Sequence, residues 1–187
     1  MSTPISRTSP AGWASVGRAA HLVLVGIPGA GKSTVGRELA ARLEWPFIDL
    51  DEEIAAREGM SVRDIFATRG ESHFRGLERA ATERLAVAEV PTVVAPGSGW
   101  ITVPGLVDMV RPPARLIWLR VSPARALERL GPGVEMRPLL SGPDPLASLT
   151  SILTAREAFY LQADHTVSVE RMTPIDVVEN ILALARP

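Results

Sequence analysis

The fold is decided by the stretch LVLVGIPGAGKST, residues 22–34. Its first four residues, Leu22–Val25, form an apolar run of strand length, and a helical periodicity begins at Lys32. Between them, Gly26–Ser33 fits the pattern G-x-x-x-x-G-K-[ST], in which backbone N–H groups curl around a phosphate. The order of strand, glycine-rich loop and helix therefore predicts a phosphate-binding loop, strengthened by the positive end of the helix dipole.

The residue types in this loop predict binding of a nucleoside triphosphate. The ammonium of Lys32 can reach the outer phosphates, and the hydroxyl of Ser33 can ligate Mg²⁺. Of the 20 basic residues, 19 are Arg and only Lys32 is Lys, which sets this position apart. The expected nucleotide contacts in the loop are Gly29, Ala30, Gly31, Lys32, Ser33 and Thr34.

Short apolar runs alternate with helical periodicities along the rest of the chain. Strands that alternate with helices predict an α/β fold with a parallel sheet covered on both faces. Two Ser/Thr-Pro pairs, Ser122-Pro123 and Thr173-Pro174, are typical of helix starts. We expect five strands at 22–25, 46–50, 92–95, 116–120 and 166–169, with helices at 32–43, in stretches up to about 88, and at 123–130, 145–162 and 174–185.

The chain is expected to hold one domain. Residues 1–20 lack a clear periodicity and are interpreted as a disordered tail, although their two arginines and lack of acids leave a short transit peptide conceivable. Residues 21–187 would form the domain. Within it, residues 131–145 are rich in Gly and Pro and long enough to form a mobile lid.

Composition excludes several classes of protein. The 187 residues include no Cys, carry a net charge of −1, and contain no apolar run near the roughly 18 residues of a membrane span. Neither disulfides nor a bulk field that recruits nucleic acid or anionic lipid is expected. We therefore expect a cytoplasmic monomer that binds small molecules rather than nucleic acid or membranes.

Acidic and basic side chains follow the second expected strand. Asp49 and Asp51 come at its carboxyl end, where ligands gather in α/β sheets, and alternation puts both on one side. One can hold Mg²⁺ through water while the other accepts the proton of an attacking hydroxyl. Further along, Arg75 and Glu78 are three residues apart on an expected helix and can form an ion pair.

Taken together, these motifs resemble the shikimate kinase family. The resemblance rests on the phosphate loop, Asp49-Leu50-Asp51, Gly70-Glu71 with Phe74-Arg75 and Glu78, and Arg137-Pro138-Leu139-Leu140, and it covers residues 21–185. It implies a three-layer P-loop kinase fold, like that of nucleoside-monophosphate kinases. It also implies Mg²⁺-assisted transfer of a phosphoryl group from ATP to shikimate, in chorismate and aromatic amino-acid biosynthesis.

The resemblance also implies roles for individual residues. Lys32, Asp51 and Arg137 match catalytic positions, Asp51 as the base that contacts the acceptor and Arg137 as an arginine of the lid. Ser33 and Asp49 match the metal site. Arg75 and Arg156 match two arginines that bind the carboxylate of the acceptor. Arg129 and Pro174 fall where the family encloses adenine, and Phe66 and Phe74 fall where aromatic walls flank the acceptor ring.

One loop departs from the family pattern. Where the family carries three consecutive glycines beside the substrate, this chain has Pro96-Gly97-Ser98-Gly99-Trp100. Ser98 disfavours a positive φ and adds a hydroxyl, and Trp100 adds a bulky indole. Either the loop repacks and Gly97, Ser98 and Gly99 still contact shikimate, or the pocket is altered for a different hydroxylated acid.

Three alternative functions remain open at this point. A gluconate-type kinase would share the phosphate loop but would not need Arg75 and Arg156. A shikimate-kinase-like module could bind the ligand as a sensor without catalysis. A nucleoside-monophosphate kinase would use Arg75 on a nucleotide acceptor.

Overall fold

A parallel sheet forms the centre of the computed structural model, which describes residues 20–134, 137–140 and 142–184. Five strands lie in the order β2-β3-β1-β4-β5, and every neighbouring pair is parallel. This arrangement confirms the predicted fold class. The strands are β1 (Leu22–Val25), β2 (Phe47–Asp49), β3 (Val93–Ala95), β4 (Arg115–Arg120) and β5 (His165–Ser168).

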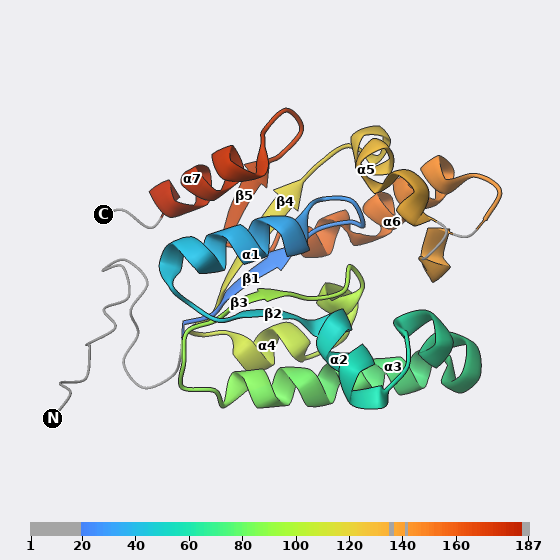
Figure 1. Ribbon diagram of the computed structural model, residues 1–187, viewed down its shortest axis with the longest axis horizontal. Helices are drawn as coiled ribbons and strands as arrows, with labels where there is room; N and C mark the ends of the chain where they lie inside the picture. Colours follow the sequence, from blue (N-terminus) through green and yellow to red (C-terminus); the bar gives the residue numbers. More distant parts are fainter. Residues whose placement is uncertain (1–19, 135–136, 141, 185–187) are drawn as a thin grey trace, which may run out of the picture.

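Helices cover both faces of the sheet (Figure 1). On one face α1 packs against α7, and on the other α3 packs against α4, while α5 packs against α6 beyond the end of β4. The helices are α1 (Lys32–Leu43), α2 (Leu50–Glu58), α3 (Val62–Ala86), α4 (Leu106–Val110), α5 (Pro123–Leu130), α6 (Pro145–Tyr160) and α7 (Pro174–Leu184).

The central strands are buried because helices remove both of their faces from water. All four residues of β1 are buried, and so are Leu116–Leu119 of β4, whose exposed ends are arginines. This continuous apolar pattern is typical of strands in a parallel sheet, in contrast to the alternation of a sheet with one wet face. The core therefore lies along β1 and β4 and fixes the position of the loops that follow them.

Both predicted Ser/Thr-Pro helix starts are confirmed. Ser122 Oγ accepts a hydrogen bond from the amide of Arg125 at the start of α5. Thr173 Oγ1 accepts one from the amide of Asp176 at the start of α7. Each hydroxyl satisfies a backbone N–H that has no partner within its helix.

Several elements differ from the sequence-based expectation. The five-residue helix α4 and short 3₁₀ turns at Trp100–Thr102, Gly131–Val134 and Pro138–Leu140 were not predicted. Helix α3 is interrupted at Gly70, whose φ of 80° and ψ of 170° are not helical. The predicted tail lies outside the described residues except for the buried Ala20, and so do Glu135, Met136 and Ser141 of the predicted lid. No helix within the described ranges is long and apolar enough to span a membrane.

Candidate functional site

The phosphate loop joins β1 to α1 and is braced by α5. Gly29 adopts a φ of +82°, and a Cβ on it would lie 2.4 Å from the carbonyl oxygen of Ala126 in α5. Only glycine fits this close approach. No side chain caps the start of α1, where Gly31 is the N-cap residue, so the amides at this helix end face the loop without a side-chain partner.

Lys32 is folded back onto its own loop. Its Nζ donates hydrogen bonds to the carbonyl oxygens of Gly26, at 2.9 Å, and Ile27, at 3.3 Å. Burial lowers the pKa of the ammonium to about 8, and the negative charge of Asp51 opposes that shift. An anionic phosphate in the loop would supply the charge that the buried ammonium lacks.

The two residues predicted to hold metal are in direct contact. Ser33 Oγ donates to Asp49 Oδ2 at 2.5 Å, and Asp49 Oδ1 caps α2 by accepting from the amides of Asp51 and Glu52. Hard oxygen ligands of this kind suit Mg²⁺, which commonly takes only one or two protein ligands and completes its shell with water and phosphate. Consistent with such a sparse site, the described residues contain no cluster of three His, Cys, Asp or Glu side chains.

Asp51 lies in the first turn of α2, beside the loop that follows β3. Within the part of the chain that the structure describes, its buried Oδ1 has no hydrogen-bond partner, and a Cβ on Gly97 would lie only 2.8 Å from that atom. Burial and the neighbouring charge of Asp49 raise the pKa of Asp51, while Lys32, Arg137 and Arg75 oppose the rise. The arrangement leaves a buried carboxylate oxygen available to a donor from a ligand.

Arg75 and Glu78 form an ion pair inside α3. Arg75 Nη1 lies 2.6 Å from Glu78 Oε2, and Glu78 is completely buried. Burial raises the pKa of Glu78 to about 7 against the opposing effect of Arg75. Arg75 also contacts the exposed carboxylate of Glu71 at 2.7 Å. The pairing was predicted from spacing, but the burial of Glu78 was not, because the stripe of apolar residues in α3 does not include it.

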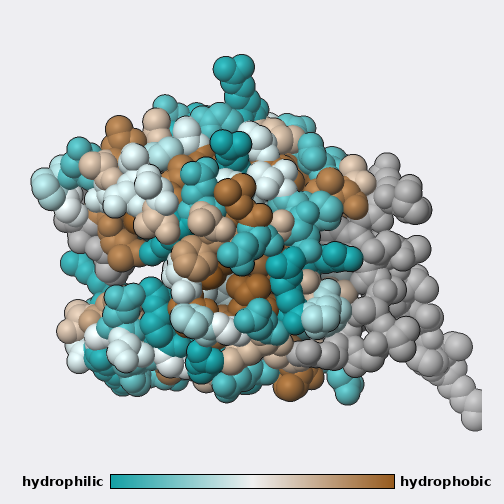
Figure 2. All heavy atoms as spheres, turned by 180° about the vertical axis from the view of Figure 1, so that it is seen from behind, coloured by the Kyte–Doolittle hydropathy of each residue, from teal (hydrophilic) through white to brown (hydrophobic). Residues whose placement is uncertain are grey.

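The loop Gly97–Gly99 separates Arg75 from Arg156. A Cβ on Gly99 would lie 2.8 Å from Arg75 Nη2, while the Oγ of Ser98 accepts a hydrogen bond from Arg156 Nη1 at 3.0 Å. Helices α3 and α6 thus bring both predicted arginines to one loop, at the carboxyl end of β3. Figure 2 shows a hollow at this end of the molecule, between the part formed by α5 and α6 and the part formed by α2 and α3.

Comparison with known proteins decides the family. A model of the shikimate kinase family matches residues 28–186 of this chain. The chain belongs to the shikimate kinase family.

Individual relatives agree with this assignment. A shikimate kinase of Symbiobacterium thermophilum is 41% identical over 164 residues, which cover 87% of this chain and 94% of the relative. A shikimate kinase of Bradyrhizobium diazoefficiens is 37% identical over 183 residues, which cover 98% of this chain and 87% of the relative. The solved structure of shikimate kinase from Acinetobacter baumannii in complex with shikimate has a TM-score of 0.84 and 31% identity, and it covers 89% of this chain and 92% of that one.

Within this shikimate kinase family member, the unusual Ser98 sits without backbone strain. Glu44 is the one non-glycine residue with a positive φ among those described, so Ser98 avoids the left-handed conformation that a serine disfavours. Its carbonyl oxygen accepts a hydrogen bond from the Tyr160 hydroxyl at 3.0 Å. Tyr160 was not predicted as a site residue, although its spacing of four residues from Arg156 places both on one face of α6.

Trp100 does not present its indole to a ligand. The side chain is completely buried in the core, and its Nε1 donates to Thr82 Oγ1 at 2.9 Å. Thr82 in turn donates to the carbonyl oxygen of Glu78, so the indole is linked to α3. The bulk of Trp100 thus lies in the core, which favours the alternative in which the loop repacks around the indole.

The predicted aromatic walls lie against each other. The ring centroids of Phe66 and Phe74 are 4.7 Å apart, and the guanidinium of Arg75 lies 5.8 Å from the centroid of Phe74. Phe74 is only 3% exposed, whereas Phe66 is partly buried. Of the two rings, Phe66 has the larger surface left for a ligand.

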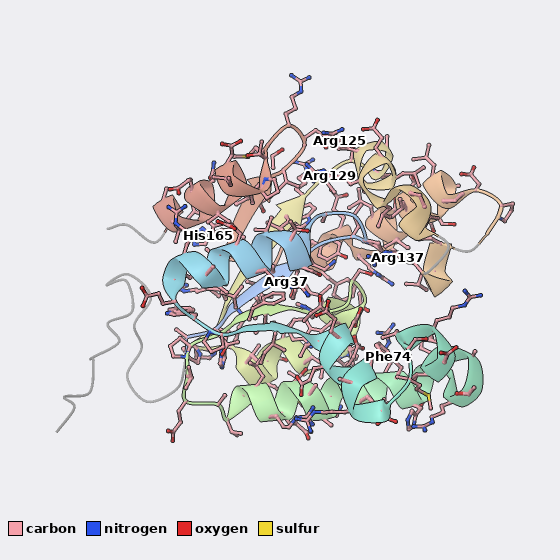
Figure 3. The ribbon with its side chains drawn as sticks, in the orientation of Figure 1. Arg37, Phe74, Arg125, Arg129, Arg137 and His165 are labelled. Atoms are coloured by element: carbon pink, nitrogen blue, oxygen red, sulfur yellow. The ribbon has the colours of Figure 1, made fainter. Side chains whose placement is uncertain are left out.

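Arg129, one of the two residues predicted to enclose adenine, lies on the opposite side of α1 from α3 (Figure 3). Arg129, in the last turn of α5, donates to the carbonyl oxygen of Val169, just after β5. The same connection leads to Pro174 at the start of α7, and Glu170 within it accepts from both the amide and the hydroxyl of Ser122. The structure thus brings the ends of α5 and β5 together beside the start of α7.

Arg137 lies between α5 and α6 in the predicted lid (Figure 3). It is exposed, and its amide donates to the carbonyl oxygen of Val134 at 3.0 Å. Its positive charge lowers the pKa values of both Lys32 and Asp51. Arg137 is therefore close enough to act electrostatically on two of the predicted catalytic residues.

Proposed function

We propose that this chain is a working shikimate kinase, which transfers the γ-phosphoryl group of ATP to a hydroxyl of shikimate and releases shikimate 3-phosphate and ADP. The observation that carries the proposal is the meeting of Arg75 and Arg156 at the loop Gly97–Gly99, next to Asp51. A hydroxylated acid bound there would place its carboxylate between two guanidiniums and a hydroxyl near a buried base. The family assignment favours shikimate over a gluconate-type acceptor.

The phosphate loop would hold the nucleotide. The backbone amides at the start of α1 would contact the phosphates, and Lys32 would leave its carbonyl partners to reach the outer ones. Arg129 and Pro174 would enclose the adenine. Ser33 would hold Mg²⁺ directly and Asp49 would hold it through water, and the ion would neutralise charge on the phosphates.

Asp51 would accept the proton of the attacking hydroxyl. Its Oδ1 has no hydrogen-bond partner among the described residues, so a substrate hydroxyl can donate to it without displacing a bond seen there. Burial and the charge of Asp49 raise the pKa of Asp51 against the opposing charges of Lys32, Arg137 and Arg75, and a raised pKa makes the carboxylate a stronger base for this proton.

Arg75 and Arg156 would fix the orientation of the acceptor. A planar guanidinium donates two parallel hydrogen bonds to a carboxylate, so two of them hold the acid in one position as well as neutralising its charge. The ring of the acceptor would lie towards Phe66, and Gly97 and Gly99 would let it approach the backbone. A neutral acceptor would leave both guanidiniums without this partner.

Arg137 would stabilise the negative charge of the phosphoryl group in the transition state of the transfer. Phosphoryl transfer depends mainly on positioning and on neutralising the charge of the transferring group, and an arginine there contributes several orders of magnitude in rate in related chemistry. The lid, residues 131–145, would close over both substrates and exclude water. We further propose that the enzyme is a cytoplasmic monomer and that its reaction is a step of chorismate biosynthesis. It would have no nucleic acid or membrane partner.

The direct test is ADP release with Mg-ATP and shikimate, in parallel with quinate, gluconate and AMP. We expect turnover with shikimate alone, and identification of the product by phosphorus NMR would show the phosphorylated hydroxyl. Lys32→Ala should abolish turnover because it removes the ammonium that contacts the phosphates. Binding of shikimate without turnover would instead indicate a sensor, and turnover with gluconate or AMP would indicate a different kinase.

A further inference from the structure

Ser98 is held to α6 at two points. Its Oγ accepts from Arg156 Nη1 at 3.0 Å, and its carbonyl oxygen accepts from the Tyr160 hydroxyl at 3.0 Å. Tyr160 is completely buried and stacks on Trp118, so the second contact is anchored in the core. The loop after β3 is therefore attached to the helix that carries one of the two acid-binding arginines.

The loop faces α3 and α6 with alternate residues. A Cβ on Gly99 would lie 2.8 Å from Arg75 Nη2 in α3, and one on Gly97 would lie 2.8 Å from Asp51 Oδ1 in α2 and 3.3 Å from Glu78 Oε1 in α3, whereas the side chain of Ser98 reaches Arg156. Arg75 thus packs against one side of the loop while Arg156 is hydrogen-bonded to the other. Because the loop also packs against Arg75, the bond from Arg156 to the Ser98 hydroxyl fixes the position of Arg156 relative to Arg75.

The bond to Ser98 leaves Arg156 free to bind an acid. Arg156 also hydrogen-bonds the Tyr160 hydroxyl, but a guanidinium has five N–H donors, so bonds to two hydroxyls leave three for a carboxylate. Among the described residues, nothing accepts the proton of the Ser98 hydroxyl. An arginine that is already ordered by its bond to Ser98 loses less conformational entropy when its ligand binds.

We infer that Ser98 is a positioning residue for the acceptor's acid group: its hydroxyl holds Arg156 in the orientation that, together with Arg75, binds the carboxylate. This inference rests on the proposed function, because it assigns the two arginines to the acceptor. It agrees with the alternative in which the loop repacks and the acceptor still binds beside Ser98. The hydroxyl contributes to binding of the acid and not to the transfer step itself.

The principal test compares Ser98→Ala with Ser98→Thr. Alanine keeps the Cβ but removes the hydroxyl, so the KM for shikimate should rise about tenfold, the effect of losing one hydrogen bond to a charged group. The kcat and the KM for ATP should stay unchanged, and threonine should restore most of the affinity. Ser151→Ala, an exposed serine on α6, is the matched control and should change nothing.

A double-mutant cycle distinguishes positioning from a general effect on the loop. In an Arg156→Ala background, Ser98→Ala should cause no further loss of shikimate affinity, because the partner of the hydroxyl is already gone. Equal losses in both backgrounds would overturn the inference. The methyl ester of shikimate, which lacks the charge, should bind Ser98→Ala as well as it binds the wild-type protein.

The Nε–Hε NMR signal of Arg156 reports on the hydrogen bond without any substrate. We expect faster motion of this group in Ser98→Ala than in the wild-type protein, and restored order in Ser98→Thr. Arg156 also hydrogen-bonds the Tyr160 hydroxyl, so Tyr160→Phe tests whether that bond orders the guanidinium in place of the bond to Ser98. If Tyr160→Phe alone frees Arg156 and Ser98→Ala does not, the inference is wrong.

The outcomes separate this inference from the proposed function. Wild-type turnover of shikimate with an unchanged KM in Ser98→Ala would overturn the inference and leave the function standing. If the wild-type protein neither binds shikimate, by calorimetry, nor phosphorylates it, the proposed function fails and the assignment of Ser98 to an acid group fails with it. A raised KM with unaltered kcat, abolished by Arg156→Ala, supports both.

Discussion

Arg75 and Glu78 form an ion pair that is buried on one side only: the Glu78 side chain is 1% exposed and the Arg75 side chain is 22% exposed. The partly exposed guanidinium of Arg75 keeps N–H donors for a ligand, whereas the buried carboxylate of Glu78 depends on Arg75 to balance its negative charge. One oxygen of Glu78, Oε1, has no hydrogen-bond partner in the described ranges and lies 3.3 Å from the position of a Cβ on Gly97. Loss of the arginine would therefore leave a buried carboxylate unpaired, which is far more costly than loss of a surface pair.

The buried state of Glu78 predicts a pH dependence of stability. Its pKa rises from 4.5 in the unfolded chain to about 7 in the folded protein, so the folded state keeps a proton that the unfolded state has released. The free energy of unfolding should therefore fall as the pH rises from about 4.5 to about 7, by up to roughly 3 kcal/mol, and level off above. Glu78→Gln should remove this contribution.

Urea unfolding at several pH values measures this effect. Glu71→Gln is the matched control, because it removes the other carboxylate that contacts Arg75 but lies on the surface. Its stability profile should follow that of the wild-type protein. A Glu78→Gln profile that keeps the wild-type slope between those two pH values would show that Glu78 has an ordinary pKa.

The lowered pKa of Lys32 predicts weaker nucleotide binding in alkaline solution. With a pKa of about 8 in the free protein, the ammonium loses its proton as the pH rises. The Kd of a non-hydrolysable ATP analogue should increase about tenfold for each pH unit above that pKa, until nucleotide binds the neutral form. Lys32→Arg stays charged and should lack this slope, whatever its affinity at neutral pH. An equal slope in both proteins would assign the titration to another group.

The close approach of Gly99 to Arg75 predicts that one added methyl group at position 99 will weaken binding of the acceptor. Its Cβ position lies 2.8 Å from Arg75 Nη2, so Gly99→Ala should displace the guanidinium and raise the KM for shikimate about tenfold, with the KM for ATP unchanged. Gly76→Ala is the control, because a Cβ there meets nothing within 4 Å. Steady-state kinetics with each substrate varied would check this. A larger defect towards ATP would place Gly99 on the nucleotide side.

Trp100 predicts a change in stability without a change in substrate affinity. Trp100→Phe removes the hydrogen bond to Thr82 and leaves a small cavity, which should lower the free energy of unfolding by about 2 kcal/mol. The KM for shikimate should remain within about twofold of the wild-type value, less than 0.5 kcal/mol. Thermal unfolding and kinetics on the same sample would separate the two effects. A raised KM at unchanged stability would mean that the indole faces the acceptor after all.

The strands and most helices could be predicted from local patterns. The first strand matches its predicted bounds, and α1 and α5 begin and end at the predicted residues, because loop and capping signals mark their limits. Helix α4 was not predicted, because five residues are too few to show a helical period. The break at Gly70 escaped because an isolated glycine in a helical pattern is compatible with an uninterrupted helix.

For the candidate site, proximity along the chain decided what could be predicted. Ser33 follows the phosphate loop after β1 and Asp49 ends β2, so both lie at the carboxyl ends of strands, where local patterns predict ligand-binding residues, although β3 separates the two strands in the sheet. The bond between Ser98 and Arg156 joins residues 58 positions apart and depends on how α6 packs, which no local pattern reveals. The same holds for the burial of Trp100. The roles of these residues remain predictions.

The stack of Trp118 on Tyr160, with ring centroids 5.6 Å apart, also gives the protein an optical reporter. Tyr160 holds the carbonyl of Ser98, so the environment of this indole is joined to the acceptor loop by one ring and one hydrogen bond. A ligand that shifts the loop would alter the tryptophan emission without any attached dye. Because the chain has no Cys, a single introduced thiol could carry an acceptor fluorophore at a chosen position, and loop movement could be followed by energy transfer.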